Sequence, residues 1–288
     1  MIVAHAPEEL APARRAVAIG TFDGVHRGHE RVLSAARTPG LRSTVVTFDP
    51  HPRLVLGFPV ELLTTLERRL ELLEAAGVED TLVLPFDESL RALAPEEFAD
   101  RVLRAIGTEV VAAGAGFRFG RGRAGDLELL AHLGFDVRPV PILDGCSSSE
   151  VRALLHAGDV ERAATLLGRP PEADGIVVHG AGRGRLLGFP TANLDSPPDL
   201  LVPALGIYAG SVLGRRAAIS VGTNPTYGGT ERRVEAHLLD FDGDLYGQRL
   251  VVELWQRLRD EATFRSEAEL IAAIEVDVAQ TREAVRPG

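Results

Sequence analysis

The hydrophobic pattern of the chain changes once, at the segment Gly168-Arg169-Pro170-Pro171, and this change constrains the fold more than any other feature. Before it, apolar runs of strand length alternate with segments of helical spacing, which is typical of a parallel, doubly wound α/β sheet. After it, short β-prone runs are separated by glycine, proline and aspartate turns, which indicates an antiparallel β-barrel. We therefore predict a Rossmann-like domain over residues 1–169 and a β-barrel domain with a closing helix over residues 170–288.

The elements that we expect in each domain follow from this pattern. In the first domain the expected strands are residues 16–19, 43–48, 81–84, 109–113 and 135–143, with helices beginning near residues 29, 64, 95, 126 and 147. In the second domain they are residues 176–179, 206–213, 217–221, 234–239 and 250–255, followed by a helix over residues 266–284. Ligands of open parallel sheets bind at the carboxyl ends of the strands, so the loops there are the first places to search for a site.

A turn at residues 20–29 joins the first expected strand to a helix and carries two histidines. Backbone N–H groups and the dipole at a helix N-terminus favour phosphate, and glycines let a polyphosphate approach the backbone. His26 and His29 can donate to phosphoryl oxygens as negative charge shifts to a leaving group. A metal site or an ordinary hydrogen-bonded role remains an alternative for this histidine pair. The residues expected to bind nucleotide in this turn are Gly20, Phe22, Asp23, Gly24 and Gly28.

The chain contains no lysine, so all 31 basic side chains are arginine. This absence excludes a Walker P-loop, a protein-kinase phosphate lysine and a Schiff base. The net charge of -10 argues against a general nucleic-acid partner. No apolar run approaches the roughly 20 residues that span a membrane, and the first residues lack the pattern of a signal peptide. We expect a cytoplasmic protein, in which the single cysteine, Cys146, excludes an intrachain disulfide.

Three further loops of the first domain carry residues with binding chemistry. Asp49-Pro50-His51-Pro52 ends the second expected strand, and its prolines forbid a continued ladder. A glycine- and arginine-rich loop at residues 114–123 contains Phe117 and Phe119, which suit either a flat ring or anchoring in the core. Ser147, Ser148 and Ser149 begin a helix that carries Arg152, an arrangement that suits a phosphate or a plain serine cap.

In the second domain, a glycine-rich loop leads into two small polar side chains. Backbone N–H groups of such a loop can lie along phosphates, and we assign this role to Gly180, Gly182, Gly184 and Arg185. Thr191 and Asn193 offer oxygen ligands of the kind that Mg²⁺ takes beside water and phosphate, although a surface turn with a polar cap is the alternative.

Glu235, in the fourth expected strand of this domain, is the carboxylate best suited to take a proton from an attacking hydroxyl. The alternative is a solvent-exposed glutamate on an edge strand.

Taken together, these motifs resemble those of the bacterial bifunctional riboflavin kinase/FMN adenylyltransferase (FAD synthetase) family, in both halves and in order. Residues 26–29, 49–52 and 147–152 resemble the family's His-x-Gly-His, Asp-Pro-His-Pro and Ser-Ser-Thr-x-Ile-Arg motifs. Residues 180–193 resemble its Gly-Arg-x-Leu-Gly-Phe-Pro-Thr-Ala-Asn-Leu motif, and residues 222–226, 234–238 and 244–247 follow in the expected order.

The resemblance implies two steps that depend on ATP and magnesium: phosphorylation of riboflavin to FMN, then adenylylation of FMN to FAD. It implies that Glu235 is the base of the kinase and that Thr191 and Asn193 hold magnesium and nucleotide. It assigns His26, His29 and Arg152 to charge stabilisation in adenylyl transfer. The residues expected at the flavin are His51, Phe117, Phe119 and Gly188.

Two departures from the family pattern keep an alternative function open. Gly116 stands where the family usually has Asn or Asp, and residues 142–146 form a shorter segment before the serines. The alternative is a riboflavin kinase whose first domain serves only binding or regulation. A flavin carrier on the same fold is a further alternative, although a carrier has no need of Thr191, Asn193 and Glu235 together. The sequence gives no prediction of the oligomeric state.

Overall fold

The computed structural model describes residues 1–180, 182–223 and 232–288. Asn224, Pro225 and Thr226 of the predicted kinase motif, and Ala181 of the glycine-rich loop, therefore lie outside the described residues. The chain forms two compact units. The first comprises Met1–Val60 and Leu66–Cys146, and the second comprises Glu61–Thr65 and Ser147–Gly288.

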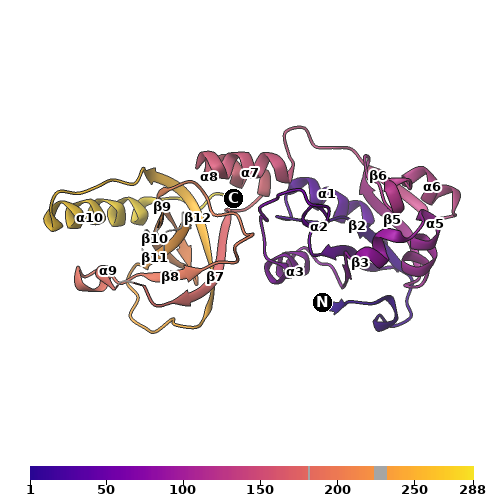
Figure 1. Cartoon of the computed structure of the whole chain (residues 1–288), viewed down its shortest axis with the longest axis horizontal. Helices are drawn as coiled ribbons and strands as arrows, with labels where there is room; N and C mark the ends of the chain where they lie inside the picture. Colours follow the sequence, from indigo (N-terminus) through magenta and orange to yellow (C-terminus); the bar gives the residue numbers. More distant parts are fainter. Residues whose placement is uncertain (181, 224–231) are drawn as a thin grey trace. The chain divides into compact units, whose positions relative to one another are not determined.

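The first unit is built on a six-stranded parallel sheet with the order β1-β4-β3-β2-β5-β6. This confirms the predicted doubly wound sheet. Figure 1 labels four of its strands, β2, β3, β5 and β6. Strand β1, which the sequence analysis missed, pairs in parallel with β4 at one edge. The strands are β1 (Ile2–Ala4), β2 (Arg15–Ile19), β3 (Arg42–Asp49), β4 (Asp80–Pro85), β5 (Thr108–Gly114) and β6 (Asp136–Val140).

Helices cover both faces of this sheet, because successive strand residues point to opposite sides. Val17 and Ile19 of β2 pack with α5, the following π-helix and α6, whereas Ala18 packs with α1 and α3. The helices of this unit are α1 (Arg27–Ala36), α2 (Pro52–Val55), α3 (Leu66–Ala75), α4 (Glu88–Ala92), α5 (Pro95–Phe98), the π-helix (Ala99–Arg104) and α6 (Leu127–His132); one-turn 3-10 helices lie at Pro7–Glu9 and Arg121–Arg123.

The second unit contains a closed, six-stranded barrel with the strand order β10-β11-β8-β7-β12-β9, in which every pairing is antiparallel. The predicted barrel is thus confirmed. The sequence analysis missed β8, which occupies part of the expected glycine-rich loop. The strands are β7 (Glu172–Val178), β8 (Ala192–Asp195), β9 (Gly206–Val212), β10 (Arg215–Thr223), β11 (Arg232–Leu238) and β12 (Arg249–Arg259).

Four helices accompany the barrel. Val151, Leu155 and Val160 of α7 and α8 belong to the same hydrophobic cluster as the barrel interior. Helix α10 packs over β9 and β10 (Figure 1), as expected for the closing helix. The helices are α7 (Ser148–Ala157), α8 (Val160–Leu167), α9 (Arg183–Leu186) and α10 (Glu267–Glu283). Within the described residues, no helix has both the length and the apolar character needed to cross a membrane.

A buried group of charges joins the amino ends of three strands of the parallel sheet. Asp80 is fully buried and accepts hydrogen bonds from Arg42 Nε and Nη2 at 2.8 and 2.6 Å and from Arg15 Nε at 3.2 Å. Burial by itself raises the pKa of Asp80, but the hydrogen bonds and charges of Arg42 and Arg15 outweigh it, so the pKa is lowered. The ionised carboxylate is therefore the form that the fold requires.

This geometry predicts how the stability of the first unit depends on Asp80 and on pH. Because its folded pKa lies below the unfolded value of about 4, Asp80 adds stability above that pH and loses it as the pH falls through the folded pKa. We expect Asp80→Asn to lower the free energy of unfolding at pH 7 by about 3–5 kcal/mol, since it leaves buried arginine charge unpaired. The difference from wild type should shrink below about pH 4, as measured by urea unfolding followed by circular dichroism.

A matched control for this prediction is Glu109→Gln. Glu109 pairs with Arg14 at the surface, where solvent screens the charges, so its loss should change stability little. Equal stability of Asp80→Asn and wild type at pH 7 would contradict the assigned role of Asp80.

Candidate active sites

In the turn after β2, the backbone adopts left-handed conformations that are rare for residues other than glycine. Phe22 and Val25 have φ angles of 52° and 37°, and Gly24 has a φ of 82°. Non-glycine residues in this left-handed region are strained, and such strain persists where surrounding packing enforces it. Phe22 and Val25 are both buried. Because their side chains are packed against the sheet and α1, the turn is held in this conformation.

His26 and His29 lie together at the start of α1. His26 caps the helix, with its Nδ1 accepting a hydrogen bond from the backbone N of His29 at 3.3 Å. The two rings stack with centroids 3.7 Å apart and an interplanar angle of 17°. A Cβ on Gly28 would lie 3.0 Å from the His26 ring, so the glycine permits this stacking. The predicted histidine pair is therefore one local cluster at the carboxyl end of β2.

Arg69 of α3 is a buried cation behind this turn that the sequence analysis missed. Its Nη1 donates to the carbonyl of Thr21 at 3.0 Å and its Nη2 donates to the carbonyl of Phe48 at 3.2 Å. Burial lowers the pKa of Arg69, although the charges of Asp49 and Asp23 act in the opposite direction. Arg69 thus holds together the residues that follow β2 and end β3. Arg69 is one of two adjacent arginines of α3, Arg68 and Arg69, and the sequence does not reveal which of them is buried.

The other predicted loops of the first unit show how each side chain is held. His51 is buried and caps α2, with its Nδ1 accepting from the backbone N of Arg53 at 3.2 Å. Phe119 belongs to the hydrophobic core, where its ring stacks on Phe117 at 5.7 Å and meets Phe98 at 5.5 Å. Phe117 is only partly buried. Anchoring, the alternative raised for phenylalanines in a loop, therefore describes the packing of Phe119, and Phe117 is the ring nearer to the surface.

Ser147 and Arg152 belong to the second compact unit, whereas His26 and His29 belong to the first. Ser147 caps α7, with its Oγ accepting from the backbone N of Glu150 at 3.1 Å, so the expected serine cap is present. Ser148 and Ser149 form the first turn of the same helix. Arg152 Nε donates to the carbonyl of Glu61 at 2.6 Å.

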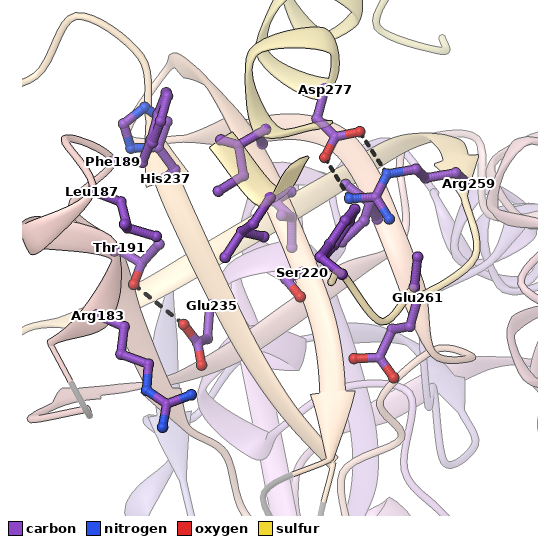
Figure 2. A pocket seen from close by; sticks show the side chains of 18 residues that line it. Arg183, Leu187, Phe189, Thr191, Ser220, Glu235, His237, Arg259, Glu261 and Asp277 are labelled. Carbon is purple, nitrogen blue, oxygen red and sulfur yellow. Dashed lines mark hydrogen bonds and ion pairs between the residues drawn. The ribbon is translucent and has the colours of Figure 1, made fainter. Parts of the chain in front are cut away.

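A second candidate site lies on the outer face of the barrel, in a cavity of about 320 Å³ beneath α10. Figure 2 shows Thr191 and Glu235 on one side of the cavity and the Arg259–Asp277 ion pair on the other. Thr191 Oγ1 donates to Glu235 Oε2 at 3.2 Å. A polar end beside apolar walls suits a ligand that combines a flat ring with a hydroxylated chain.

The register of the barrel explains why Glu235 faces this cavity. Val234 and Ala236 of β11 point into the barrel core, so the residue between them points outward. Glu235 pairs with Ser220 of β10, and both line the cavity. Strand β11 lies between β10 and β8, so the alternative of an edge-strand glutamate is excluded.

Glycines bring the loop after β7 against the strand that carries Asn193. A Cβ on Gly180 would lie 2.5 Å from the Asn193 side chain, and one on Gly184 would lie 2.4 Å from the Phe189 carbonyl. Asn193 Nδ2 lies 3.5 Å from Thr191 Oγ1, so these two predicted magnesium ligands are neighbours. The alternative of a surface turn is excluded for Asn193, because this residue is buried within β8, where it pairs with Glu235 of β11.

Of the predicted kinase residues, Gly184, Thr191 and Glu235 line the cavity, whereas Gly182, Arg185 and Gly188 do not. Arg185 is exposed, and both glycines adopt positive φ.

Most of the opposite wall was missed by sequence reasoning. Arg259 at the end of β12 binds Asp277 of α10 through two hydrogen bonds, at 2.9 and 2.8 Å. This pair fixes α10 over the cavity, and Leu270 and Ile274 of the helix supply apolar wall. Glu261 also lines it. A glutamate and an arginine in a polar segment give no sequence signal of their own, since the cavity forms only when α10 folds back.

Magnesium fits the residues around Thr191, although not as a cage of protein ligands. Within residues 1–180, 182–223 and 232–288, no group of three or more His, Cys, Asp or Glu side chains could hold a metal ion. Mg²⁺ bound beside nucleotide keeps several waters and uses one or two protein oxygens with the phosphates. The hydroxyl of Thr191 and the carboxylate of Glu235 offer such oxygens at one end of the cavity. The amide of Asn193 lies beside Thr191, although Asn193 is not among the residues that line the cavity.

The two units together define a two-domain transferase, with a parallel α/β sheet of the type that binds nucleotides and a β-barrel whose cavity has a polar end and apolar walls. The family model described as FAD synthetase matches residues 9–148, and the model described as riboflavin kinase matches residues 167–285. The chain belongs to the bifunctional riboflavin kinase/FMN adenylyltransferase family. The presence of both domains favours the bifunctional enzyme over the kinase-only alternative.

Relatives of that name share the whole arrangement. The protein from Listeria monocytogenes is 35% identical, with 96% of this chain and 94% of that protein covered. The protein from Pseudomonas fluorescens is 40% identical, with 93% and 92% covered. A crystal structure of a protein from Streptococcus pneumoniae, named as a macrolide-efflux protein, has a TM-score of 0.86 and 31% identity, covering 98% of both chains.

The position of Arg69 predicts a selective effect on the first unit. We expect Arg69→Met to lower kcat/KM for ATP in FMN adenylylation by roughly ten- to a hundredfold, because the turn after β2 loses its connection to the end of β3. Arg69→Lys should give a smaller loss, since an ammonium is a point charge and lacks the planar fork that reaches both carbonyls. Riboflavin phosphorylation should not change. Steady-state kinetics of both reactions on the same preparation measure this difference.

The control for Arg69 is Arg68→Met on the same helix, which removes a guanidinium that pairs with Glu71 at 2.6 Å. A parallel fall of both activities in Arg69→Met would show general unfolding and contradict the assigned role.

Proposed function

We propose that riboflavin is phosphorylated at the cavity beneath α10 and that FMN is adenylylated at the histidine turn that follows β2. The observation that carries the first assignment is the hydrogen-bonded pair of Thr191 and Glu235 in a cavity large enough for a flat ring. The second rests on the stacked histidines at the start of α1. The small-molecule substrates are riboflavin, FMN and ATP.

In the kinase reaction, Glu235 accepts the proton of the terminal ribityl hydroxyl as that oxygen attacks the γ-phosphorus of ATP. The bond between the γ-phosphorus and the bridging oxygen breaks, and ADP leaves. Glu235 is directed outward by β11 and held by Thr191, which orients its carboxylate. Magnesium, when bound by Thr191 and Asn193, supplies charge neutralisation for the phosphates. The backbone of Gly180, Gly182 and Gly184, with Arg185, lies along the nucleotide.

In the adenylyl transfer, a phosphate oxygen of FMN attacks the α-phosphorus of ATP and pyrophosphate leaves. His26 and His29 donate hydrogen bonds to the phosphoryl groups, and Arg152 neutralises developing negative charge. The nucleotide lies against the amide groups at residues 20–24 and 28, with the serines at residues 147–149 as further phosphate donors. In this domain, His51 and the ring of Phe117 contact the flavin, and Phe119 packs behind Phe117. In the kinase domain, Gly188 contacts the flavin.

We assign residues 1–169 to the adenylyltransferase domain and residues 170–288 to the kinase domain. This boundary places α7 and α8 with the first domain by function, because they continue the serine motif, although they pack in the second unit. We also propose a cytoplasmic location. A reducing compartment fits the single cysteine, Cys146, which is buried.

Separate inactivation of the two domains tests this assignment. We expect Glu235→Gln to lower kcat for riboflavin phosphorylation by roughly 10²- to 10⁴-fold, because the general base is lost, and to leave adenylylation of supplied FMN unchanged. We expect His29→Ala to do the reverse, with a loss of about 10²- to 10³-fold. Product analysis over time, with riboflavin, ATP and magnesium, distinguishes the variants: the first forms little FMN, and the second accumulates FMN without FAD.

The proposal would be overturned by wild-type protein that forms no FMN, or by a single variant that abolishes both reactions while remaining folded. Formation of more than one FMN per protein chain also excludes a flavin carrier.

The proposed magnesium ligands predict a change in metal dependence. Thr191→Val keeps the shape of the side chain but removes its hydroxyl oxygen, so we expect the magnesium concentration for half-maximal kinase rate to rise about tenfold. Thr191→Ser should restore it, because the oxygen returns. The metal dependence of adenylylation should not move. Titration of both activities with MgCl₂ after treatment with EDTA makes the measurement, and an unchanged kinase titration in Thr191→Val would contradict the ligand assignment.

A further inference from the structure

The ladder between β8 and β11 ends beside the residues assigned to the kinase reaction. Its last pair is Ala192 with Ala236, and both side chains are buried in the barrel core. One further step would place Thr191 opposite His237, with both side chains on the outer face of the barrel, because successive strand residues point to opposite sides. Both residues line the cavity beneath α10 (Figure 2).

The side chain of His237 connects the two segments beyond the point where the backbone ladder stops. Its Nδ1 lies 2.8 Å from the carbonyl oxygen of Pro190, the residue before Thr191. A carbonyl oxygen can only accept, so Nδ1 carries the proton and donates the hydrogen bond. Pro190 has no N–H to give to a ladder, and its carbonyl is bound by this side chain instead.

The segment before β8 is thus attached to β11 at two neighbouring residues. His237 holds the carbonyl of Pro190, and Thr191 Oγ1 donates to Glu235 Oε2 at 3.2 Å. Glu235 and His237 are two residues apart on one strand, so they lie on the same face of it. The ring of Phe189 meets the His237 ring edge-on, with centroids 5.5 Å apart and an interplanar angle of 79°. One contact fixes the backbone, and the other orients the carboxylate.

The position of the Thr191 backbone depends strongly on such hydrogen bonds. None of residues 182–190 is buried, so hydrophobic packing holds this segment only weakly. If the backbone moves, the hydroxyl of Thr191 leaves the Glu235 carboxylate that it orients. A misplacement of about 1 Å at a reacting group can slow a reaction by about a hundredfold. A residue that fixes Pro190 therefore affects the reaction without taking part in it.

We propose that His237 is a positioning residue for riboflavin phosphorylation, which fixes the backbone before Thr191 and so keeps the hydroxyl on the Glu235 carboxylate. The proposal rests on the assignment of Glu235 and Thr191 to that reaction. In this role His237 does not receive the proton of the substrate hydroxyl, and it acts through Thr191.

The choice of side chain at position 237 tests the proposal in the full chain. Asparagine carries its amide nitrogen close to where Nδ1 of histidine stands, so His237→Asn keeps a donor for the Pro190 carbonyl. Leucine has nearly the same shape but no donor. We expect His237→Leu to lower kcat for riboflavin phosphorylation by roughly ten- to a hundredfold, with KM for riboflavin changed less than about threefold. The kcat of His237→Asn should stay within about threefold of wild type.

A double-mutant cycle measures whether His237 acts through Thr191. In a Thr191→Val background at saturating magnesium, His237→Leu should lower kcat further by less than about twofold, because the hydroxyl to be positioned is already gone. His237→Gln is a second test, since its amide nitrogen stands nearer to the position of Nε2 and should not replace Nδ1. Its kcat should fall as in His237→Leu.

The matched control is His132→Leu. The Nδ1 of His132 also lies at a backbone carbonyl, that of Glu128 at 2.9 Å, but in the first unit. Its riboflavin phosphorylation should equal that of wild type. Thermal unfolding followed by circular dichroism confirms that each variant is folded under the assay conditions.

Three results would overturn the proposal, and they separate it from the assignment on which it rests. A fully active Glu235→Gln variant would remove the kinase assignment and the positioning role together. An inactive Glu235→Gln variant beside a fully active His237→Leu variant would leave the assignment in place and eliminate only the positioning role. Equal losses from His237→Leu and His237→Asn, or from His237→Leu with and without the Thr191 hydroxyl, would show that the histidine acts by direct contact with the ligand.

Discussion

Ion pairs between arginine and buried aspartate hold the elements on which both sites are built. Asp80, Asp174 and Asp277 are each at most 4% exposed, and each receives two hydrogen bonds from one guanidinium. The pairing partners are Arg42, Arg249 and Arg259. A buried carboxylate is costly unless it is paired and hydrogen-bonded, and the planar fork of arginine meets both oxygens at once. In a chain without lysine, arginine supplies each of these three contacts.

One of these pairs, Arg259–Asp277, anchors α10 over the cavity of the barrel. The residues of α10 that are most buried are Asp277 and Thr281, whereas Leu270 and Ile274 are only partly buried. The helix is therefore anchored through Arg259 and through Arg216, whose Nη1 donates to the carbonyls of Thr281 and Ala284. The apolar side chains of Leu270 and Ile274 line the cavity. Anchoring by charge thus leaves apolar surface available for the ligand.

Local sequence signals predicted the parts of the fold that depend on neighbouring residues. The glycine-histidine turn, the serine cap of α7 and the strand that carries Glu235 all depend on a few neighbouring residues, and each appears where it was predicted. Strand β8 was missed because Ala192–Asp195 becomes a strand only by pairing with β7 and β11. Arg69 and the wall at Glu261 were missed for the same reason, since burial of a polar residue depends on contacts distant in the sequence.

The segment Glu61–Thr65 shows the limit of sequence reasoning most clearly. Its pattern gave no reason to separate it from α3, which it precedes. Only the bridge between Leu62 and Leu200 and the contacts to Arg152 assign it to the second unit. A single predicted boundary divides the chain into two continuous domains. In the structure, a short segment within the sequence of the first unit belongs to the second unit.

Position 116 shows how the structure separates a requirement of the fold from a requirement of the ligand. A Cβ at Gly116 would meet no atom within 4 Å, and a positive φ is not what makes glycine necessary there. An asparagine or aspartate would therefore fit without moving its neighbours. Gly180 is the opposite case, since the side chain of Asn193 lies where its Cβ would stand. Packing thus requires glycine at position 180, whereas the structure leaves room for a larger residue at position 116. Glycine at position 116 is therefore not a requirement of packing in the first unit.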